Sequence, residues 1–101
     1  MLENKLLWHY NVAMANIKLH LDHYLSYFAN NQRIVIVSGN TVYECINDFV
    51  SRFPELRKVI GIEPSSSIIN VYLEKEETAV ENFARPVKEG DDLYLMFISG
   101  G

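Results

Sequence analysis

The order of elements in this chain is decided by the stretch from residue 33 to residue 54, RIVIVSGNTVYECINDFVSRFP. Residues 33–37 are mostly β-branched, which is typical of a strand, and Ser-Gly-Asn after them is typical of a turn. Thr41 and Glu44 then form the Thr-x-x-Glu pattern of a helix N-terminal capping box. Apolar residues recur at helical spacing behind it, and Pro54 cannot continue a helix. The stretch therefore predicts a strand followed by a helix of about three turns.

Upstream of this stretch, apolar and polar residues alternate from Ile17 to Asp22. Ile17, Leu19 and Leu21 fall on one side of this pattern, as in a half-buried strand. We expect this strand to pair with residues 33–37 as an antiparallel hairpin, because residues 24–32 resemble a mixed aromatic and polar connection.

Downstream, the sequence predicts a short helical turn after Pro54 and a third strand over residues 68–73. Residues 74–77 form a charged turn, and residues 78–80 are compatible with a short edge strand. Gly90 supplies the unusual φ of a tight turn, and residues 93–98 are a final strand that is apolar on both faces. Such a strand lies in the middle of a sheet, or presents one face to a partner.

The resulting order of strands and helix is β-β-α-β-(β)-β. It predicts an α+β protein with the β-grasp layout, in which a mixed sheet of four to five strands wraps over one main helix. The final strand returns to the middle of the sheet beside the first one. Residues 1–13 are expected to be an N-terminal extension, and residues 14–101 a single domain.

Composition excludes several classes of protein. The 101 residues carry 9 Lys and Arg against 13 Asp and Glu, so the basic surface of a nucleic-acid-binding domain is not expected. The single cysteine excludes a disulfide framework and a four-cysteine zinc site. No apolar run approaches the ~18 residues of a membrane span, and the N-terminus lacks the features of a secretion signal. We expect a cytoplasmic protein with no stably bound metal or cofactor.

Two segments resemble a known family. The turn region at residues 88–93, KEGDDL, precedes the last strand, and the sequence ends in Ser99-Gly100-Gly101. With the predicted order of elements, these resemble the ubiquitin-like sulfur carriers of the MoaD/ThiS family, which comprise the small subunit of molybdopterin synthase and the sulfur carrier of thiamine biosynthesis. The resemblance covers about residues 17–101. Residues 96–98 stand where molybdopterin-synthase members usually carry two prolines, so the sulfur pathway stays open.

The resemblance implies a chemistry for the terminal glycines. In the family, a partner enzyme resembling the ubiquitin-activating enzymes uses ATP to adenylate the last glycine, here Gly101. A sulfur donor then converts the adenylate to a thiocarboxylate. Gly100 and Gly101 have no Cβ, so a mobile tail can thread a narrow channel with its carbonyl accessible to attack. The protein is expected to be a carrier and cosubstrate rather than an enzyme.

The resemblance also implies partners and a surface that binds them. The partners are the adenylyltransferase and a synthase that accepts the sulfur, either the large subunit of molybdopterin synthase or thiazole synthase. If one face of the last strand packs on the helix, Tyr94, Met96 and Ile98 point outward, and with Ser99 they form the expected partner-binding residues. Alternatively, residues 6–8, Leu-Leu-Trp, cover this face from within the chain.

Two further functions stay open from the sequence alone. A ubiquitin-like modifier would join Gly101 to lysines of other proteins as an isopeptide, and a β-grasp interaction domain would carry an inert tail. The acidic group Glu89, Asp91 and Asp92 could steer the protein to a basic partner or simply be a solvated turn.

Other chemical groups are set aside. His20 and His23 are expected on opposite faces of a strand, where they cannot share a metal. Cys45 lies on the apolar face of the predicted helix, so a buried structural role is expected. Tyr24, Tyr27 and Phe28 are expected to pack at the core or its edge.

Overall fold

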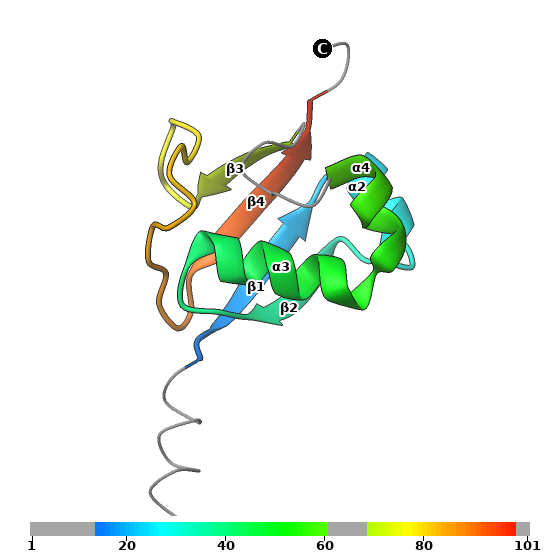
Figure 1. Ribbon diagram of the computed structural model, residues 1–101. Helices are drawn as coiled ribbons and strands as arrows, with labels where there is room; N and C mark the ends of the chain where they lie inside the picture. Colours follow the sequence, from blue (N-terminus) through cyan, green and yellow to red (C-terminus); the bar gives the residue numbers. More distant parts are fainter. Residues whose placement is uncertain (1–13, 61–68, 99–101) are drawn as a thin grey trace, which may run out of the picture.

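The computed structural model describes residues 14–60 and 69–98 of the chain, apart from the side chain of residue 59. These residues form one sheet with a long helix lying across it (Figure 1). The strands are β1 (Asn16–Leu21), β2 (Ile34–Ser38), β3 (Ile69–Leu73) and β4 (Asp92–Phe97). The helices are α2 (His23–Phe28), α3 (Val42–Arg52), the 3-10 turn η1 (Pro54–Leu56) and α4 (Arg57–Ile60).

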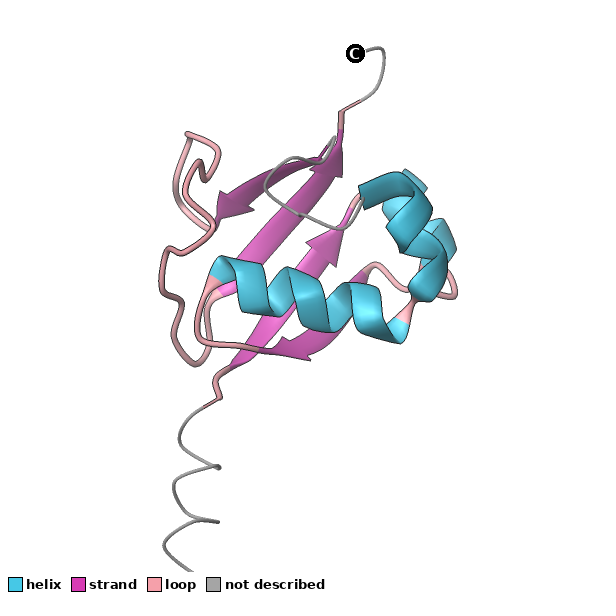
Figure 2. Ribbon diagram, in the orientation of Figure 1, coloured by secondary structure: helices cyan, strands magenta, loops and turns pink. Residues whose placement is uncertain are grey.

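The sheet has the strand order β2-β1-β4-β3. The two central strands, β1 and β4, run parallel, while β2 pairs antiparallel with β1 and β3 pairs antiparallel with β4. The last strand therefore lies beside the first, as predicted, with α3 crossing one face of the sheet (Figure 2). This confirms the α+β class and the β-grasp layout.

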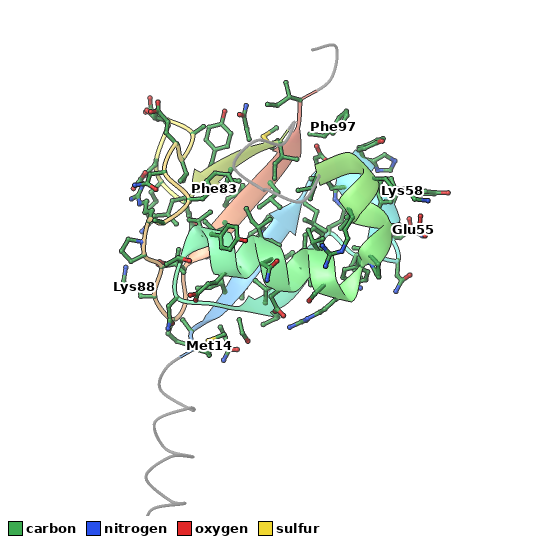
Figure 3. The ribbon with its side chains drawn as sticks, in the orientation of Figure 1. Met14, Glu55, Lys58, Phe83, Lys88 and Phe97 are labelled. Carbon is green, nitrogen blue, oxygen red and sulfur yellow. The ribbon has the colours of Figure 1, made fainter. Side chains whose placement is uncertain are left out.

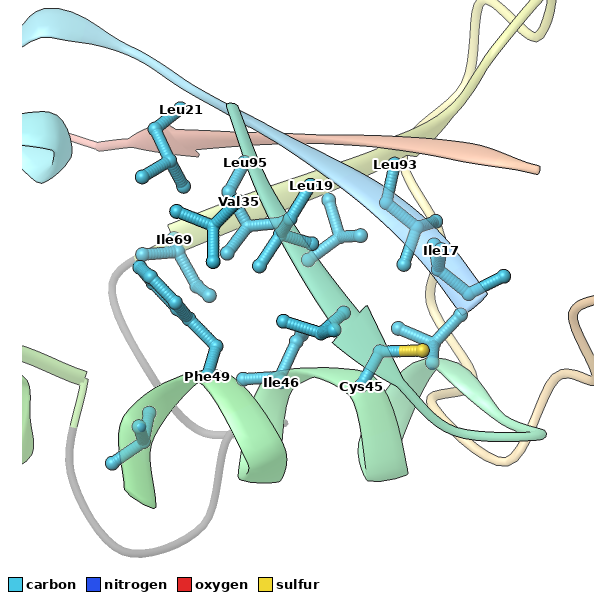
Figure 4. Close-up of a cluster of buried hydrophobic side chains, with 14 of the residues drawn as sticks. Ile17, Leu19, Leu21, Val35, Cys45, Ile46, Phe49, Ile69, Leu93 and Leu95 are labelled. Carbon is cyan, nitrogen blue, oxygen red and sulfur yellow. The ribbon is translucent and has the colours of Figure 1, made fainter. Parts of the chain in front are cut away.

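The core lies between the central strands and α3. Alternate residues of β1 and β4 face the helix, and all of them except the half-buried Phe97 at the end of β4 are at most 4% exposed. Figure 4 shows those that meet Cys45, Ile46 and Phe49 of α3: Ile17, Leu19, Leu21, Leu93 and Leu95. Burial of one such aliphatic side chain contributes roughly 1.5–3 kcal/mol to folding, so this two-layer contact dominates the stability of the domain.

The start of α3 follows the predicted capping pattern with one difference. The Thr41 hydroxyl accepts a hydrogen bond from the Glu44 N–H at 3.1 Å, as a capping residue should. The Glu44 carboxylate reaches back to the N–H of Asn40 at 2.7 Å, one residue before the cap. Glu44 therefore fixes the turn that leads into the helix as well as the helix itself.

The end of α3 also follows the sequence. The helix ends at Arg52, Phe53 is its C-terminal cap, and Pro54 begins the 3-10 turn. The short helical turn predicted after Pro54 is confirmed, and Leu56 and Ile60 in it are at most 1% exposed as part of the core.

The prediction that residues 24–32 form only a connection is wrong, because α2 occupies the first part of this segment. The Asp22 carboxylate caps the helix by accepting the Leu25 N–H at 2.8 Å, and Leu25 is fully buried. Most of the remaining residues of α2 are exposed or half-buried, so the segment shows no clear helical period. Asn30 and Asn31, both at positive φ, form the turn that follows.

The suggested edge strand over residues 78–80 is not formed either. Val80 donates one backbone hydrogen bond to the Val71 carbonyl at 2.7 Å, but no ladder follows. The sheet of the described residues therefore has four strands, at the lower end of the predicted range.

No helix in residues 14–60 and 69–98 is long and apolar enough to cross a membrane. The expected extension at residues 1–13, with the Leu-Leu-Trp segment proposed as an alternative cover for the sheet, lies outside the described residues. The boundary at residue 14 stays a prediction.

Candidate docking face and tail exit

The face of β4 that points away from α3 carries the predicted partner-binding residues. Tyr94, Met96 and Ile98 are 37%, 50% and 40% exposed, whereas Leu93 and Leu95, which alternate with Tyr94 and Met96, are buried. The alternation along the strand produces this separation, because successive side chains point to opposite faces of a sheet. The outward direction of Tyr94, Met96 and Ile98 is therefore as predicted. The remaining predicted site residues, Ser99, Gly100 and Gly101, lie outside the described residues.

A row of exposed and half-buried side chains crosses this outer face. In the register of the sheet, Ile34 of β2 is opposite His20 of β1, His20 is beside Tyr94, and Tyr94 is opposite Tyr72 of β3. Ile34 is 49% exposed. The exposed residues of β4 thus belong to a surface that extends over all four strands. This surface is not visible in the sequence alone, because register is a tertiary property.

The ring of Tyr94 is held in place by a polar pair. The His20 imidazole stacks on it with centroids 4.2 Å apart and planes 13° apart. His20 Nε2 lies 2.7 Å from Asp92 Oδ1. This hydrogen bond, aided by the charge of Lys18, holds the pKa of the Asp92 carboxyl below its usual range. The pair therefore orders the centre of the outer face before any partner binds.

Two open grooves flank the Tyr94 and Met96 side chains. One, of about 390 Å³, lies toward β1 and β2 and includes His20 and Arg33. The other, of about 560 Å³, lies toward β3 and the acidic turn at residues 74–77. Because Tyr94 and Met96 line both grooves, they form a ridge between them. A ridge of aromatic and thioether groups between two hollows is suited to a protein partner with a complementary surface.

The carboxyl end of β4 is anchored on the β1 side by Asp22. Its Oδ2 accepts the Phe97 N–H at 2.7 Å, and its own N–H donates to the Leu95 carbonyl at 3.2 Å. The Tyr24 ring also contacts the Phe97 ring, with centroids 4.3 Å apart. Figure 3 labels Phe97 at this end of the strand. In the sequence, Asp22 has no predicted role beyond the polar alternation, although an Asp three residues before Leu25 is a usable capping signal.

The acidic residues near the last turn each have an intramolecular role. Glu89 accepts the Asn16 N–H at 2.8 Å, and Asp91 accepts the Lys88 N–H at 2.9 Å. Gly90 has a φ of 88°, as expected for the predicted tight turn. These contacts support the interpretation of the acidic group as part of a turn. Steering of a basic partner stays a prediction.

The chemical groups set aside from the sequence are placed as follows. His20 lies on β1, but His23 begins α2, so the assumption that both lie on one strand is wrong. Cys45 is fully buried, and this burial, with the nearby Glu44 and Asp48 charges, raises the pKa of its thiol to about 12. No cluster of three or more potential metal-ligating side chains occurs in residues 14–60 and 69–98.

The aromatic residues of α2 pack against one another and the end of β4. Tyr24 contacts Phe28 as well as Phe97, and Tyr27 contacts Phe28. Tyr27 is 74% exposed, so this group lies at the edge of the core. The prediction that these three aromatic residues pack at the core or its edge is therefore confirmed, and the edge is where they lie.

No protein-family model and no curated protein sequence matches the chain. Solved structures do match it. SAMP1 from Haloferax volcanii is 26% identical, with a TM-score of 0.68 over 86% of this chain and 100% of that one. A chain of the Amycolatopsis orientalis BexX/CysO complex is 24% identical, with a TM-score of 0.69 over 84% of this chain and 98% of that one.

A third match is small archaeal modifier protein 1 from Methanosarcina acetivorans. It is 21% identical, with a TM-score of 0.70 over 87% of this chain and 97% of that one. Each match extends over nearly the whole length of the similar chain. The protein therefore has the ubiquitin-like β-grasp fold that these small proteins share.

Proposed function

We propose that this protein is a ubiquitin-like sulfur carrier that acts through the carboxylate of Gly101. A partner enzyme joins this carboxylate to the α-phosphate of ATP, with pyrophosphate as the leaving group. Nucleophilic sulfur from a sulfur donor then displaces AMP and leaves a thiocarboxylate. The carrier delivers this sulfur to an acceptor in molybdopterin, thiamine or related biosynthesis. The protein is a cosubstrate in these steps, and the partner supplies the catalytic groups.

The observation that carries the proposal is the relation between the outer face and the tail. Tyr94 and Met96 are exposed on a central strand, Ile98 is exposed directly after it, and Gly101 follows Ile98 by three residues. An enzyme that grips this face therefore has the terminal glycine within a short reach of its own active site. The similarity to SAMP1 and to a chain of the BexX/CysO complex supports the same assignment through the fold.

The proposed partners are an adenylyltransferase that resembles ubiquitin-activating enzymes and a sulfur-accepting synthase, either a molybdopterin synthase large subunit or a thiazole synthase. Both would dock on the apolar ridge of β4. Because activation consumes ATP, we place this activity in the cytoplasm.

A second candidate is protein modification. It is favoured by the 26% identity to a protein named as a modifier, SAMP1 of Haloferax volcanii. The same adenylate would form at Gly101, but a lysine amine of a target protein would displace AMP and form an isopeptide bond. Both functions need the same first step, so they are separated by the nucleophile that follows.

The test is the intact mass of the purified chain after incubation with ATP, an activating enzyme and a sulfur donor. We expect a shift that corresponds to one oxygen replaced by sulfur. Conjugates of higher mass that survive reducing, denaturing gels would support the modifier instead. Neither product, and no adenylate, would overturn both.

Deletion of Gly101 is the matched control. It is expected to abolish activation and to leave the melting temperature nearly unchanged, since the contacts of the core lie in the described residues before it. A large loss of stability in this variant would contradict a purely chemical role for the tail.

A further inference from the structure

The feature that carries a further inference is the way β4 ends. β1 and β4 run in parallel until Leu21 and Leu95, after which β1 stops and the chain turns into α2. A parallel neighbour would normally accept the next N–H of β4, which belongs to Phe97. The Asp22 carboxylate accepts it instead, at 2.7 Å. A side chain thus replaces the missing part of the central ladder.

The same carboxylate has a second partner. Asp22 Oδ1 accepts the Leu25 N–H of α2 at 2.8 Å while Oδ2 accepts the Phe97 N–H. Capping a helix needs only one side-chain oxygen, and a serine could provide it. The second oxygen therefore has a separate effect, which is to tie the end of β4 to the start of α2. Hydrogen bonds to a charged carboxylate are about twice as strong as neutral ones.

A ring contact reinforces this tie. Tyr24, two residues after Asp22, lies over the Phe97 ring with centroids 4.3 Å apart and planes 30° apart. Phe97 is thus held through its backbone by Asp22 and through its side chain by Tyr24. Figure 3 places Phe97 at the end of the strand, and only Ile98 follows it among the described residues.

The position of Phe97 limits where the terminal glycine can be delivered. Three residues follow Ile98, and three residues span at most about 11 Å even when fully extended. A small change in the place or direction in which β4 ends would therefore move the reachable volume of Gly101 by a comparable amount. Alignment of a reacting group matters at this scale, because misplacement by about 1 Å can cost a hundredfold in rate.

We infer that Asp22 and Tyr24 are positioning residues that fix the exit of the C-terminal tail for its activation. The effect on activation rests on the proposed function. The link between Asp22, Tyr24 and Phe97 rests on the contacts above. Neither residue touches the reacting atoms. They act through Phe97 and are not part of the ridge of Tyr94 and Met96, although Asp22 also lines the groove on the β1 side of that ridge.

Asp22→Ser is the variant that separates the two roles of the carboxylate. A serine hydroxyl caps α2 but is too short to reach the Phe97 N–H as well. Tyr24→Ala removes the ring contact, and Tyr24→Phe keeps it and should restore wild-type behaviour. Thr41→Ala is the matched control, since it removes one capping hydrogen bond from α3 and leaves the Asp22 tie intact.

The first measurement is hydrogen exchange of the Phe97 amide by NMR, which needs no partner enzyme. We expect about tenfold faster exchange in Asp22→Ser than in the wild type, because the amide loses its charged acceptor. In Thr41→Ala the exchange rate of the Phe97 amide should change no more than the exchange rates of the other core amides. An unchanged Phe97 amide in Asp22→Ser would overturn the inference whatever the function of the protein.

The second measurement is the rate of activation with the partner enzyme. We expect kcat to fall about tenfold in Asp22→Ser and in Tyr24→Ala. KM for the carrier should stay unchanged in Tyr24→Ala, because Tyr24 lines neither groove beside the docking ridge. An unchanged kcat together with fast Phe97 exchange would overturn the positioning role. Failure of the wild type to be activated would instead overturn the proposed function and the delivery role, while the exchange result would still decide whether the tie exists.

Discussion

At the scale of single residues, Gly39 is a position where the surrounding backbone leaves no room for a side chain. A Cβ placed on Gly39 would lie 2.8 Å from the Cys45 backbone nitrogen and 2.9 Å from the Glu44 Cβ. Both atoms belong to the first turns of α3, which the core holds against the sheet. The glycine is therefore required by the close approach of the turn to the helix, and the sequence showed it only as a turn residue.

We predict that Gly39→Ala destabilises the domain by about 1–3 kcal/mol, because neither the helix backbone nor the buried Cys45 can move away without loss of packing. Chemical denaturation with an unchanged m-value measures this loss. Gly90→Asn is the control, since a Cβ at Gly90 meets nothing within 4 Å and asparagine tolerates positive φ. A loss at Gly39 no larger than the loss at Gly90 would contradict the steric argument.

At the scale of the elements, β2 lies at one end of the strand order and α3 protects its outer edge. Arg52 Nη1 donates to the Ile36 carbonyl at 2.7 Å, and Asp48 Oδ2 accepts the Ser38 N–H at 3.0 Å. Arg52 and Asp48 are also paired with each other at 2.8 Å. Backbone groups that would otherwise invite pairing with another chain are thus occupied by an ion pair of the helix.

We predict that the double variant Asp48→Ala/Arg52→Ala self-associates more strongly than the wild type. Its loss of unfolding free energy should be modest, about 1–2 kcal/mol, because the groups are partly exposed. Light scattering over a concentration series measures the association.

The matched control for this variant is Glu55→Ala/Lys58→Ala. In this pair Lys58 Nζ lies 3.3 Å from Glu55 Oε1, and both side chains are exposed. Like the first double variant, this one removes one positive and one negative charge, so the net charge stays the same. Equal association of the two double variants would show that the edge of β2 is not the responsible surface.

At the scale of the whole molecule, one face of the sheet contributes to stability and the other is available for binding. The inner face of the sheet and α3 form the core, and the outer face presents the ridge of Tyr94 and Met96 between two grooves. A substitution on the outer face can therefore alter binding to a partner without altering the fold. The proposed carrier function requires this separation, because the partner would bind the folded domain while the reaction takes place at Gly101.

We predict that Met96→Glu raises KM for activation about tenfold while the melting temperature stays close to that of the wild type, because a charge at the centre of an apolar contact is desolvated on docking. Steady-state kinetics with the activating enzyme measure this. Tyr43→Glu on α3 is the control, since Tyr43 has a similar exposure of 42% and is absent from both grooves that flank the ridge. Equal effects of the two variants would contradict docking on the outer face.

Elements with strong local signals could be predicted from the amino-acid pattern alone. The capping pattern at Thr41 and Pro54 set the limits of α3, and alternation set the inward and outward faces of β1 and β4. The same local reasoning failed for α2, because a six-residue helix with few buried residues has too short a pattern to recognise. It also failed for residues 78–80, where apolar residues suggested a strand that forms no ladder.

How distant segments meet depends on the folded molecule as a whole. Register brought Ile34, His20, Tyr94 and Tyr72 into one row, and the turn after β1 brought the Asp22 carboxylate to the Phe97 N–H, 75 residues away in sequence. The physical reason is that local patterns fix the conformation and facing of each segment. Contacts between segments depend on which strands become neighbours and where each one ends, and these are settled only when the sheet closes over the helix.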